Sequence, residues 1–402
     1  ALLPVLSGRI PGLFVTERGV TGFGVSAGSA GQITIRGVGN NPNTGILVLI
    51  DGHPQFMGIF GHPLPDSYVA SDVERVEVIR GPGSVLYGTN ALGGVINIIT
   101  KKQSQEGLNG NARVMVGSFN TQKYMGSAGY KKERFNVFAS INHDKTDGHR
   151  DHSDFSITNG YLKTGYALAK NWNATADFSL AGFGASDPGP DKPGGTAGQE
   201  IDITRGYGAV SLNNDNDKTS GSARFYYNFG EHEITDGFHS TDRNLGFNIY
   251  ESFRLYRGNT LTFGSDYANY GGMAENLLAM QGKGMVFADT AVHELAFYGF
   301  VQQNFFDKIS LNAGLRYSDH RSYGSVCIPS VGITYQTGKA TGWKAIVSKG
   351  FRSPTMRELF VWGSNLHLQP ENIWNYETGI LHSFPDKKLN IELTAFILKG
   401  EN

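Results

Sequence analysis

The feature that most constrains this chain is an alternation of apolar and polar residues that recurs in segment after segment from about residue 103 onward. Ile309, Leu311, Leu315 and Tyr317 share one parity, whereas Ser310, Asn312, Arg316 and Ser318 share the other. The same pattern begins near Arg134, Trp172, Ala223, Thr260, His293, Thr341 and Leu389. A period of two is the pattern of a β-strand with two different faces, so we expect a mainly β fold.

Alternation alone does not separate a soluble β-protein from a membrane barrel, because the apolar face can meet either a core or lipid. The segments are about 9–11 residues long, which suits a tilted membrane strand. Aromatic residues lie near segment ends, for example at 226–227 and 305–306. Short connections such as 304–308 alternate with long ones such as 183–204 and 271–290. Together these features favour a transmembrane antiparallel β-barrel.

Composition narrows the functional classes. Lys plus Arg total 35 and Asp plus Glu total 36, so no basic excess is available for nucleic acid. The single cysteine, Cys327, excludes an internal disulfide and a cysteine-based zinc site. No apolar run is long enough for a transmembrane helix. The first residues lack the basic region of a signal peptide, so we expect either an intracellular protein or a processed or trimmed chain.

The first hundred residues have a different pattern and predict a small α+β domain. Short apolar strands are expected at 33–36, 46–50 and 95–100, and an alternating strand at 73–80. The continuous apolar run at 46–50 is typical of a strand that is buried on both faces. Residues 84–92 are expected to contain a short helical turn.

The N-terminal motifs resemble the plug domain of TonB-dependent outer-membrane receptors. They are Ile33-Thr34-Ile35-Arg36-Gly37, Val48-Leu49-Ile50-Asp51-Gly52, Val73-Glu74-Arg75-Val76-Glu77-Val78-Ile79-Arg80-Gly81-Pro82, Tyr87-Gly88 and Gly93-Gly94-Val95-Ile96-Asn97-Ile98-Ile99-Thr100. The stretches 350–354, 358–360, 368–371 and 375–379 resemble sequence boxes of the same family's barrel. The resemblance implies a plug at residues 1–102 inside a barrel formed by residues 103–402.

The family's barrel has 22 strands. Residues 103–402 contain about sixteen credible strands. We therefore expect the C-terminal strands, and also the energy-coupling segment before the plug, to be missing from this sequence.

The resemblance also implies a function in the outer membrane of a Gram-negative bacterium. Such a receptor binds a scarce metal-containing ligand (a ferric siderophore, haem, cobalamin or another metal chelate) and imports it without catalysing a reaction. Its expected partners are outer-membrane lipid, the chelate and the inner-membrane TonB complex, with a surface lipoprotein as a further candidate and no nucleic acid. The alternatives are a glycan or peptide importer of the same architecture, a passive porin-like barrel, and a soluble β-rich binding protein or hydrolase.

The loops after Arg36 and Asp51 are the candidate ligand site. The side chains proposed to contact ligand are Asn40, Asn41, Asn43, His53, Gln55, Phe56, Met57 and His62. Imidazole and thioether groups suit haem iron and softer metals, which makes His53, Met57, His62 and His367 weak metal candidates. The competing interpretation is a loop whose histidines stabilise turns next to proline. No covalent cofactor is expected, because iron, cobalt or another metal would arrive with the ligand.

Ion pairs across the plug–barrel boundary are the second expectation. Arg36 and Arg80 end plug strands, while Glu371 and Glu377 lie near a barrel strand, so guanidinium–carboxylate pairs could fix the plug in register. No catalytic site is predicted. Residues 151–154 contain the residue types of a hydrolase triad, but neighbours in one polar loop rarely have triad geometry.

Overall fold

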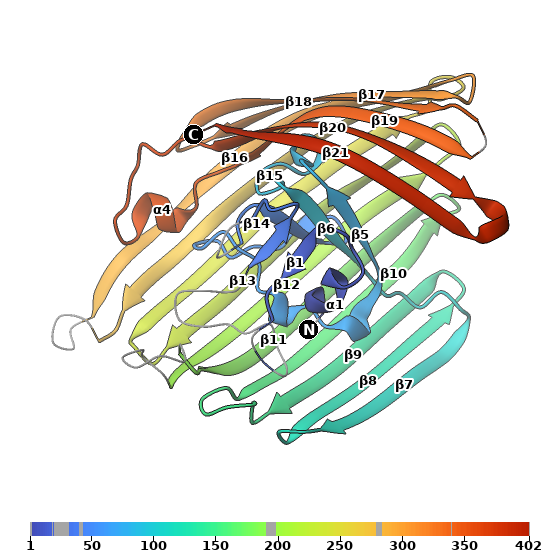
Figure 1. Cartoon of the computed structure of the whole chain (residues 1–402). Helices are drawn as coiled ribbons and strands as arrows, with labels where there is room; N and C mark the ends of the chain where they lie inside the picture. The colour runs from blue at the N-terminus through green and yellow to red at the C-terminus, as the bar shows by residue number, and fades with distance from the viewer. Residues whose placement is uncertain are drawn as a thin grey trace.

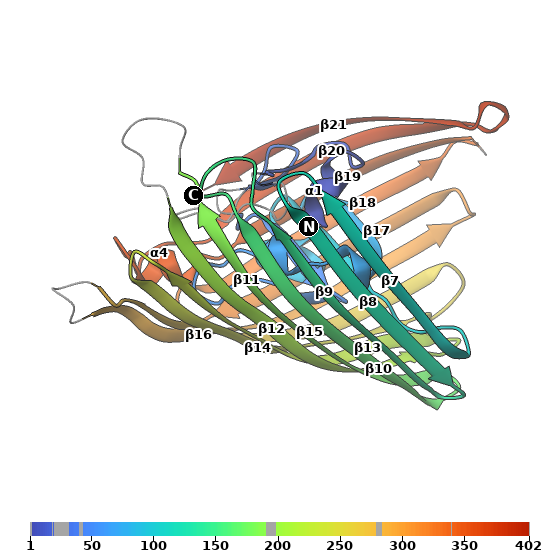
Figure 2. The same ribbon diagram turned by 90° about the horizontal axis from the view of Figure 1, so that it is seen from below.

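The computed structural model describes residues 2–17, 19, 32–39, 43–189, 198–278, 284–338 and 340–401. Two of the predicted ligand contacts, Asn40 and Asn41, lie outside these residues. A small N-terminal domain occupies the concave side of one large curved sheet formed by the rest of the chain (Figure 1). Seen from below, the sheet wraps around this domain as a wide trough (Figure 2). This arrangement confirms the predicted plug and barrel wall.

The plug consists of short elements around a four-stranded sheet with the order β4-β3-β6-β5. Its elements are α1 (Leu3–Ser7), β1 (Leu13–Val15), β2 (Ile33–Ile35), β3 (Ile46–Ile50), β4 (His53–Pro54), β5 (Val73–Arg80), α2 (Ser84–Tyr87) and β6 (Gly94–Thr100). All five residues of β3 are buried, as the apolar run predicted, and β3 pairs in parallel with β6.

Two tight turns set the direction of the plug strands. Asp51 and Gly52 have φ values of 47° and 88° and connect Ile50 directly to its partner His53. Asp-Gly is a favoured sequence for such a two-residue hairpin, since both central residues need positive φ. Arg36 and Gly37 form a similar turn, with φ values of 54° and 79°.

The wall is a single antiparallel sheet of fifteen strands in chain order. The strands are β7 (Gly107–Gly117), β8 (Thr121–Lys132), β9 (Phe135–Thr146), β10 (Phe155–Ala169), β11 (Trp172–Asp187), β12 (Gln199–Asp215), β13 (Thr219–Ile234), β14 (Phe238–Phe253), β15 (Asn259–Asn276), β16 (Met285–Phe305), β17 (Ile309–His320), β18 (Gly324–Gln336), β19 (Thr341–Arg352), β20 (Glu371–Phe384) and β21 (Leu389–Glu401). In the described part of the chain β7 and β21 are the two edges of the sheet.

The wall carries its apolar residues on the outside. On β17, Leu315 and Tyr317 are exposed, whereas their neighbours Arg316 and Ser318 are buried. A soluble protein shows the opposite arrangement, because charged residues are almost never fully buried there while large apolar ones are. An apolar outer face with a polar inner face is the pattern of a sheet in lipid. This confirms the predicted transmembrane β architecture.

The strands are longer than predicted, from 11 residues in β7 to 21 in β16. Parts of the expected loops 183–204 and 271–290 are therefore strand, and the connections shrink to 188–198 and 277–284. At the same end of β10 the inner residues Phe155 and Ile157 are apolar and buried. The inner face is thus not polar throughout, because here it packs against the plug.

The lengths of the connections between strands distinguish the two ends of the sheet. Connections 133–134, 170–171 and 216–218 lie at one end, whereas 188–198 and 353–370 lie at the other. Outer-membrane barrels have short periplasmic turns and longer external loops, which assigns the second end to the outside. The external connection 353–370 contains α4 (Met356–Phe360). None of the helices described in the structure has the length and hydropathy needed to cross a membrane.

Candidate functional site

The plug reaches the external end through one compact loop, residues 55–64, which we call the apical loop. Two backbone hydrogen bonds close it: Met57 N donates to His62 O at 2.9 Å, and Gly61 N donates to Met57 O at 2.8 Å. Met57, Ile59 and Leu64 pack into an apolar cluster with the inner faces of the wall strands β10–β12. The loop is therefore built into the wall on one side.

A buried carboxylate of the wall fixes the loop. Asp242 Oδ1 accepts a hydrogen bond from Gly58 N at 2.7 Å, and Asp242 Oδ2 lies 2.6 Å from Arg205 Nη1. Arg205 also donates to the carbonyl of Phe56 at 3.2 Å. A Cβ added to Gly58 would lie 2.5 Å from the Gly271 carbonyl oxygen, so only glycine allows this approach of two backbones.

The external connection covers the loop from the other side. Arg357 N of α4 donates to Ile59 O at 2.9 Å, while Asn90 Nδ2 of the plug itself donates to Gly61 O at 3.1 Å. A capping box between Thr355 and Glu358 starts α4 and orients this contact. The apical loop consequently contacts the plug, the wall and an external connection at the same time.

Aromatic rings surround the outer side of the loop. We call this group the aromatic floor: Phe60, Phe238, Phe287 and Trp362, with His62 and His232. The ring centroids of Trp362 lie 5.3 Å from Phe238 and 5.2 Å from Phe287. Trp362 remains 49% exposed, and the Arg357 guanidinium lies 5.7 Å from its ring centroid. An exposed ring beside a cation suits a flat or aromatic ligand with negative charge.

The histidines predicted to contact ligand are buried. His53 is 0% exposed and lies against Tyr207 and Tyr226, with centroids 4.8 Å and 5.4 Å away. Burial, helped by the Arg224 guanidinium, lowers the pKa of His53 to about 3. Burial also lowers the pKa of His62 to about 4, although the Pro63 carbonyl at 3.0 Å opposes this shift. Both rings are therefore neutral at physiological pH.

The remaining predicted ligand contacts have mixed positions. Asn43 is buried and closes a turn with both backbone groups of Ile46, at 2.9 and 3.0 Å. Phe56 and Met57 are buried, and Gln55 is half-buried. His367 is exposed in the external connection. No cluster of three or more His, Cys, Asp or Glu side chains that could hold a metal ion occurs within the described ranges.

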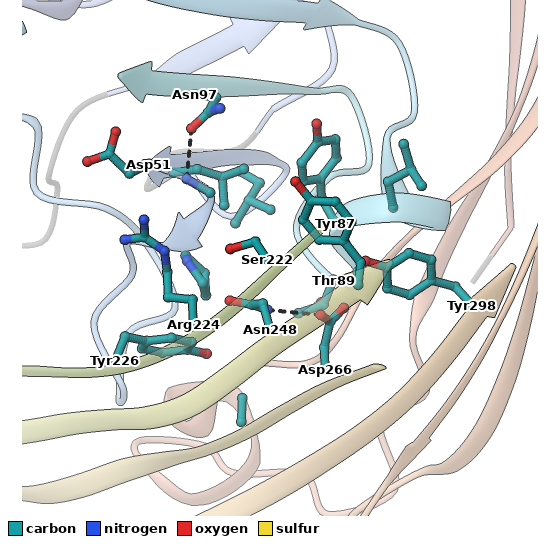
Figure 3. Close-up of a pocket in the computed structure, with 18 of the residues that line it drawn as sticks. Asp51, Tyr87, Thr89, Asn97, Ser222, Arg224, Tyr226, Asn248, Asp266 and Tyr298 are labelled. Atoms are coloured by element: carbon teal, nitrogen blue, oxygen red, sulfur yellow. Dashed lines mark hydrogen bonds between the residues drawn. The ribbon is translucent and has the colours of Figure 1, made fainter. Parts of the chain in front are cut away.

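A cavity of about 530 Å³ with a mixed polar and apolar lining lies below the apical loop, between the plug and the wall strands β12–β17 (Figure 3). Plug residues Asp51, Phe56 and Tyr87 line one side. The wall side includes Asn213, Ser222, Arg224, Tyr226, Asn248, Tyr250, Ser252, Thr262, Asp266, Tyr270, Glu294, Tyr298 and Arg316. Arg316 and Asp266 form an ion pair of 2.6 Å, and Asn248 donates to Asp266 at 3.0 Å.

The plug–barrel ion pairs differ in part from the prediction. Arg36 Nη1 lies 2.5 Å from Glu377 Oε2, which joins the plug to β20. Arg80 instead faces Glu392 on β21, at 3.3 Å. Glu371 does not pair with the plug, because Arg352 of the neighbouring strand β19 holds it at 2.6 Å. Sequence spacing could not distinguish these carboxylates, since the depth at which each meets the plug depends on the register between plug and wall.

A further boundary pair was not predicted from the sequence. Lys163 Nζ on β10 lies 2.9 Å from Asp51 Oδ2 and donates to Thr100 Oγ1 at 2.8 Å. Burial alone would raise the pKa of Asp51, yet Lys163 and the hydrogen bonds from Thr100 together hold it below the ordinary value. The sequence signal was the position of Lys163, a charged residue, on the same parity as Phe155, Ile157 and Tyr161.

Two family models match the sequence. The TonB-dependent Receptor Plug Domain matches residues 3–95, and the TonB dependent receptor-like beta-barrel matches residues 100–402. The chain is 26% identical to the "Iron-regulated outer membrane virulence protein" of Vibrio cholerae over 96% of its own length and 61% of that protein. It is also 26% identical to the "Vitamin B12 transporter BtuB" of Photobacterium profundum, over 92% of the chain and 60% of the transporter. The chain therefore spans about three-fifths of the length of these relatives.

Solved structures show the same fold. A mutant of the ferric enterobactin receptor PfeA of Pseudomonas aeruginosa, in complex with enterobactin, superimposes with a TM-score of 0.80 at 20% identity, over 100% of this chain and 70% of that one. The ferric yersiniabactin uptake receptor FyuA of Yersinia pestis gives a TM-score of 0.75 at 16% identity, over 98% of this chain and 69% of that one.

Proposed function

The chain belongs to the TonB-dependent receptor family of the outer membrane, and from this membership we propose that it binds a metal chelate at the aromatic floor and imports it. The ligand is not chemically converted. The iron, vitamin B12 and siderophore names among the relatives support a metal-containing cargo.

The observation that carries this proposal is the half-exposed Trp362 beside Arg357, directly above the apical loop. Aromatic faces and a guanidinium recognise flat, electron-rich and anionic groups. Ferric chelates with aromatic or carboxylate arms have this chemistry. His53 and His62 are neutral and packed, so we propose that the protein recognises the organic surface of the chelate and that the metal arrives already enclosed.

Transport needs an energy source, and the proposed source is the inner-membrane TonB complex. Ligand at the aromatic floor touches the outer side of a loop that the plug, wall and external connection share. Ligand binding can shift the plug toward a conformation that the TonB complex recognises only if the ligand binds two arrangements of that loop with different affinities. The contacts at Gly58, Ile59 and Gly61 are the ones that such a change would alter. A surface lipoprotein partner stays an untested expectation.

The proposal is tested by titrating the purified full-length protein with a panel of ligands while tryptophan fluorescence is recorded. The panel contains a ferric tricatecholate, a ferric trihydroxamate, haem, cyanocobalamin, an oligosaccharide and a short peptide. We expect quenching by at least one metal chelate, and loss of most of that signal in Trp362→Phe. Trp343→Phe is the matched control, since Trp343 is exposed on the outer face at the opposite end. Saturable binding of the oligosaccharide or peptide alone would support a glycan or peptide importer instead.

A further inference from the structure

We propose that the periplasmic end of the wall binds the headgroups of anionic phospholipids in the inner leaflet of the outer membrane. The binding groups are four exposed cations in the short connections between strands, which we call the basic rim: Arg134, Lys170, Lys218 and Lys308. This inference concerns the lipid around the protein, so it does not depend on which ligand the aromatic floor binds.

The basic rim takes one cation from each of four different turns. Arg134 lies in connection 133–134, Lys170 in 170–171, Lys218 in 216–218 and Lys308 in 306–308. Connection 254–258, between the last two, adds Arg254 and Arg257. Successive turns at one end of an antiparallel sheet are two strands apart, which is about 10 Å. This distance is close to the Debye length at physiological salt, so the fields of neighbouring turns overlap.

The carboxylates near these turns do not cancel the positive charge. Two of them, Asp215 and Asp307, lie 3.6 Å from the two arginines of connection 254–258. Glu133 and Asp217 share turns with members of the basic rim, but in the described chain neither lies within ion-pair distance of them. Counting these connections together with Asp215, six cations face four carboxylates. A net positive charge therefore remains at this end.

Connection 306–308 lies at the edge of the lipid-facing band. Phe305 and Ile309 flank it, and the alternation of β16 and β17 turns both side chains outward. A strand advances about 3.3 Å per residue, so Lys308 begins directly next to the apolar band. Its long side chain can keep its stem on apolar surface and its ammonium group in the polar layer. The cation is therefore placed at the depth of the phospholipid headgroups.

Large apolar side chains accompany the cations. Phe306 is 92% exposed at the tip of its turn, and Leu255 and Tyr256 are 61% and 64% exposed in the neighbouring connection. Asn304 N donates to Gly258 O at 2.7 Å, which holds the two turns side by side. The interfacial layer of a bilayer accepts aromatic rings of this kind, and its anionic headgroups attract basic side chains. Because these tips continue the lipid-facing band, we assign the surface to phospholipid and not to an acidic protein.

The external end of the same strands has the opposite charge. Asp202 and Glu233 are direct partners on the outward parity of β12 and β13. Beside them the two ring nitrogens of His239 lie 3.0 Å from Glu231 and 2.9 Å from Glu275. Acidic groups on one side of the band and basic groups on the other favour anionic lipid at the periplasmic end of β12–β15.

The first test measures which lipid the protein retains. The full-length protein is reconstituted in nanodiscs of equal parts phosphatidylglycerol and phosphatidylcholine, and the lipids that stay bound are counted by native mass spectrometry. We expect several-fold enrichment of phosphatidylglycerol in the wild type, which falls as salt is raised. Lys218→Gln combined with Lys308→Gln should lose most of this enrichment.

The matched control is Arg150→Gln combined with Arg321→Gln, which removes two exposed cations from external connections. It should keep the enrichment of the wild type. A wild type without enrichment, or an equal loss in the two double variants, would overturn the inference.

The second test locates the apolar tip. Phe306→Cys on a background without other cysteines carries a spin label in vesicles of phosphatidylglycerol and phosphatidylcholine. We expect the label to be more accessible to oxygen, which partitions into lipid, than to a water-soluble nickel chelate. Asp236→Cys is the control, because Asp236 is exposed in the external connection 235–237 and its label should favour the nickel chelate. Equal access of the nickel chelate at both positions would show that the tip stays in water and would reject lipid as its partner.

Discussion

Arg36 Nη1 of the plug lies 2.5 Å from Glu377 Oε2 of β20, and both side chains are more than nine-tenths buried. The Arg36 guanidinium also lies 4.6 Å from the ring centroid of Phe396 on β21. One plug residue therefore contacts two adjacent wall strands. Removing one partner of a buried pair leaves an uncompensated charge, which typically costs about 3–5 kcal/mol.

We expect Glu377→Gln to weaken the docking of the plug by an amount of this order. The measurement is a urea titration in which the hydrogen exchange of plug amides reports the undocking of the plug. Glu77→Gln is the matched control, because Glu77 pairs with Arg75 in an exposed position where such pairs contribute about 0–1 kcal/mol. Equal effects of the two substitutions would show that the buried pair does not hold the plug.

The Asp51–Lys163 pair predicts a dependence on acid. The pKa of Asp51 in the folded protein lies below its ordinary value of 3.8. The stability that this carboxylate contributes is therefore fully present above pH 3.8 and is lost as pH falls through the lower folded value. We expect plug docking to weaken in this acid range in the wild type.

Lys163→Met removes the cation and leaves Asp51 buried without it. We expect docking at pH 7 to weaken by about 3–5 kcal/mol, and Asp51→Asn combined with Lys163→Met to recover part of the loss. A double-mutant cycle on plug unfolding measures this coupling. A coupling energy near zero would mean that the two groups do not interact.

Buried neutral His53 predicts a second pH effect at higher pH. Its folded pKa of about 3 lies below the ordinary 6.5, so the unfolded chain takes up a proton between these values and the folded chain does not. The contribution of His53 is complete above pH 6.5 and declines as pH falls toward 3. We expect His53→Phe, which keeps a ring against Tyr226, to flatten the stability profile in this range. An unchanged slope in His53→Phe would contradict a buried neutral imidazole.

Substitution of Asp242 is expected to change the apical loop locally. Asp242→Ala leaves Arg205 and the Gly58 amide without their acceptor, so we expect faster hydrogen exchange at Gly58 and Gly61 with little change in the β3 and β6 amides. Asp289→Ala, at an exposed position near the same end of the wall, is the control. Uniformly faster exchange across the plug would indicate that Asp242 supports the whole domain instead of the loop.

Much of the architecture could be predicted because it follows from local pattern. The alternation at 309–318 specified which side chains face lipid, and the run at 46–50 specified the buried plug strand. Strand ends were placed poorly. At the external end of β10 the inner residues, such as Phe155, are apolar because they pack against the plug, which a single amphipathic pattern does not predict.

The site was harder to predict because it depends on contacts between distant segments. His53 and Met57 have the chemistry of metal ligands, yet the turn at Asp51–Gly52 directs the chain back along β3, and both side chains are buried. Trp362 and Arg357 were not singled out, since their meeting with Phe60 requires the external connection to fold over the apical loop. Arg36 and Arg80 were predicted to pair with wall carboxylates, and Glu377 was among the candidates. The partner of Arg80, Glu392, was not, because register across the boundary is a tertiary property.

The most direct measurement is the accumulation of radioactive iron, supplied as the chelate that binds in the fluorescence titration, by intact cells that express the full-length protein as their only such receptor. The account predicts saturable accumulation that stops when TonB is deleted and falls strongly in the variant that combines Trp362→Ala with Arg357→Gln. Iron accumulation that continues without TonB, or that is unchanged in the double variant, would contradict energised import through the aromatic floor.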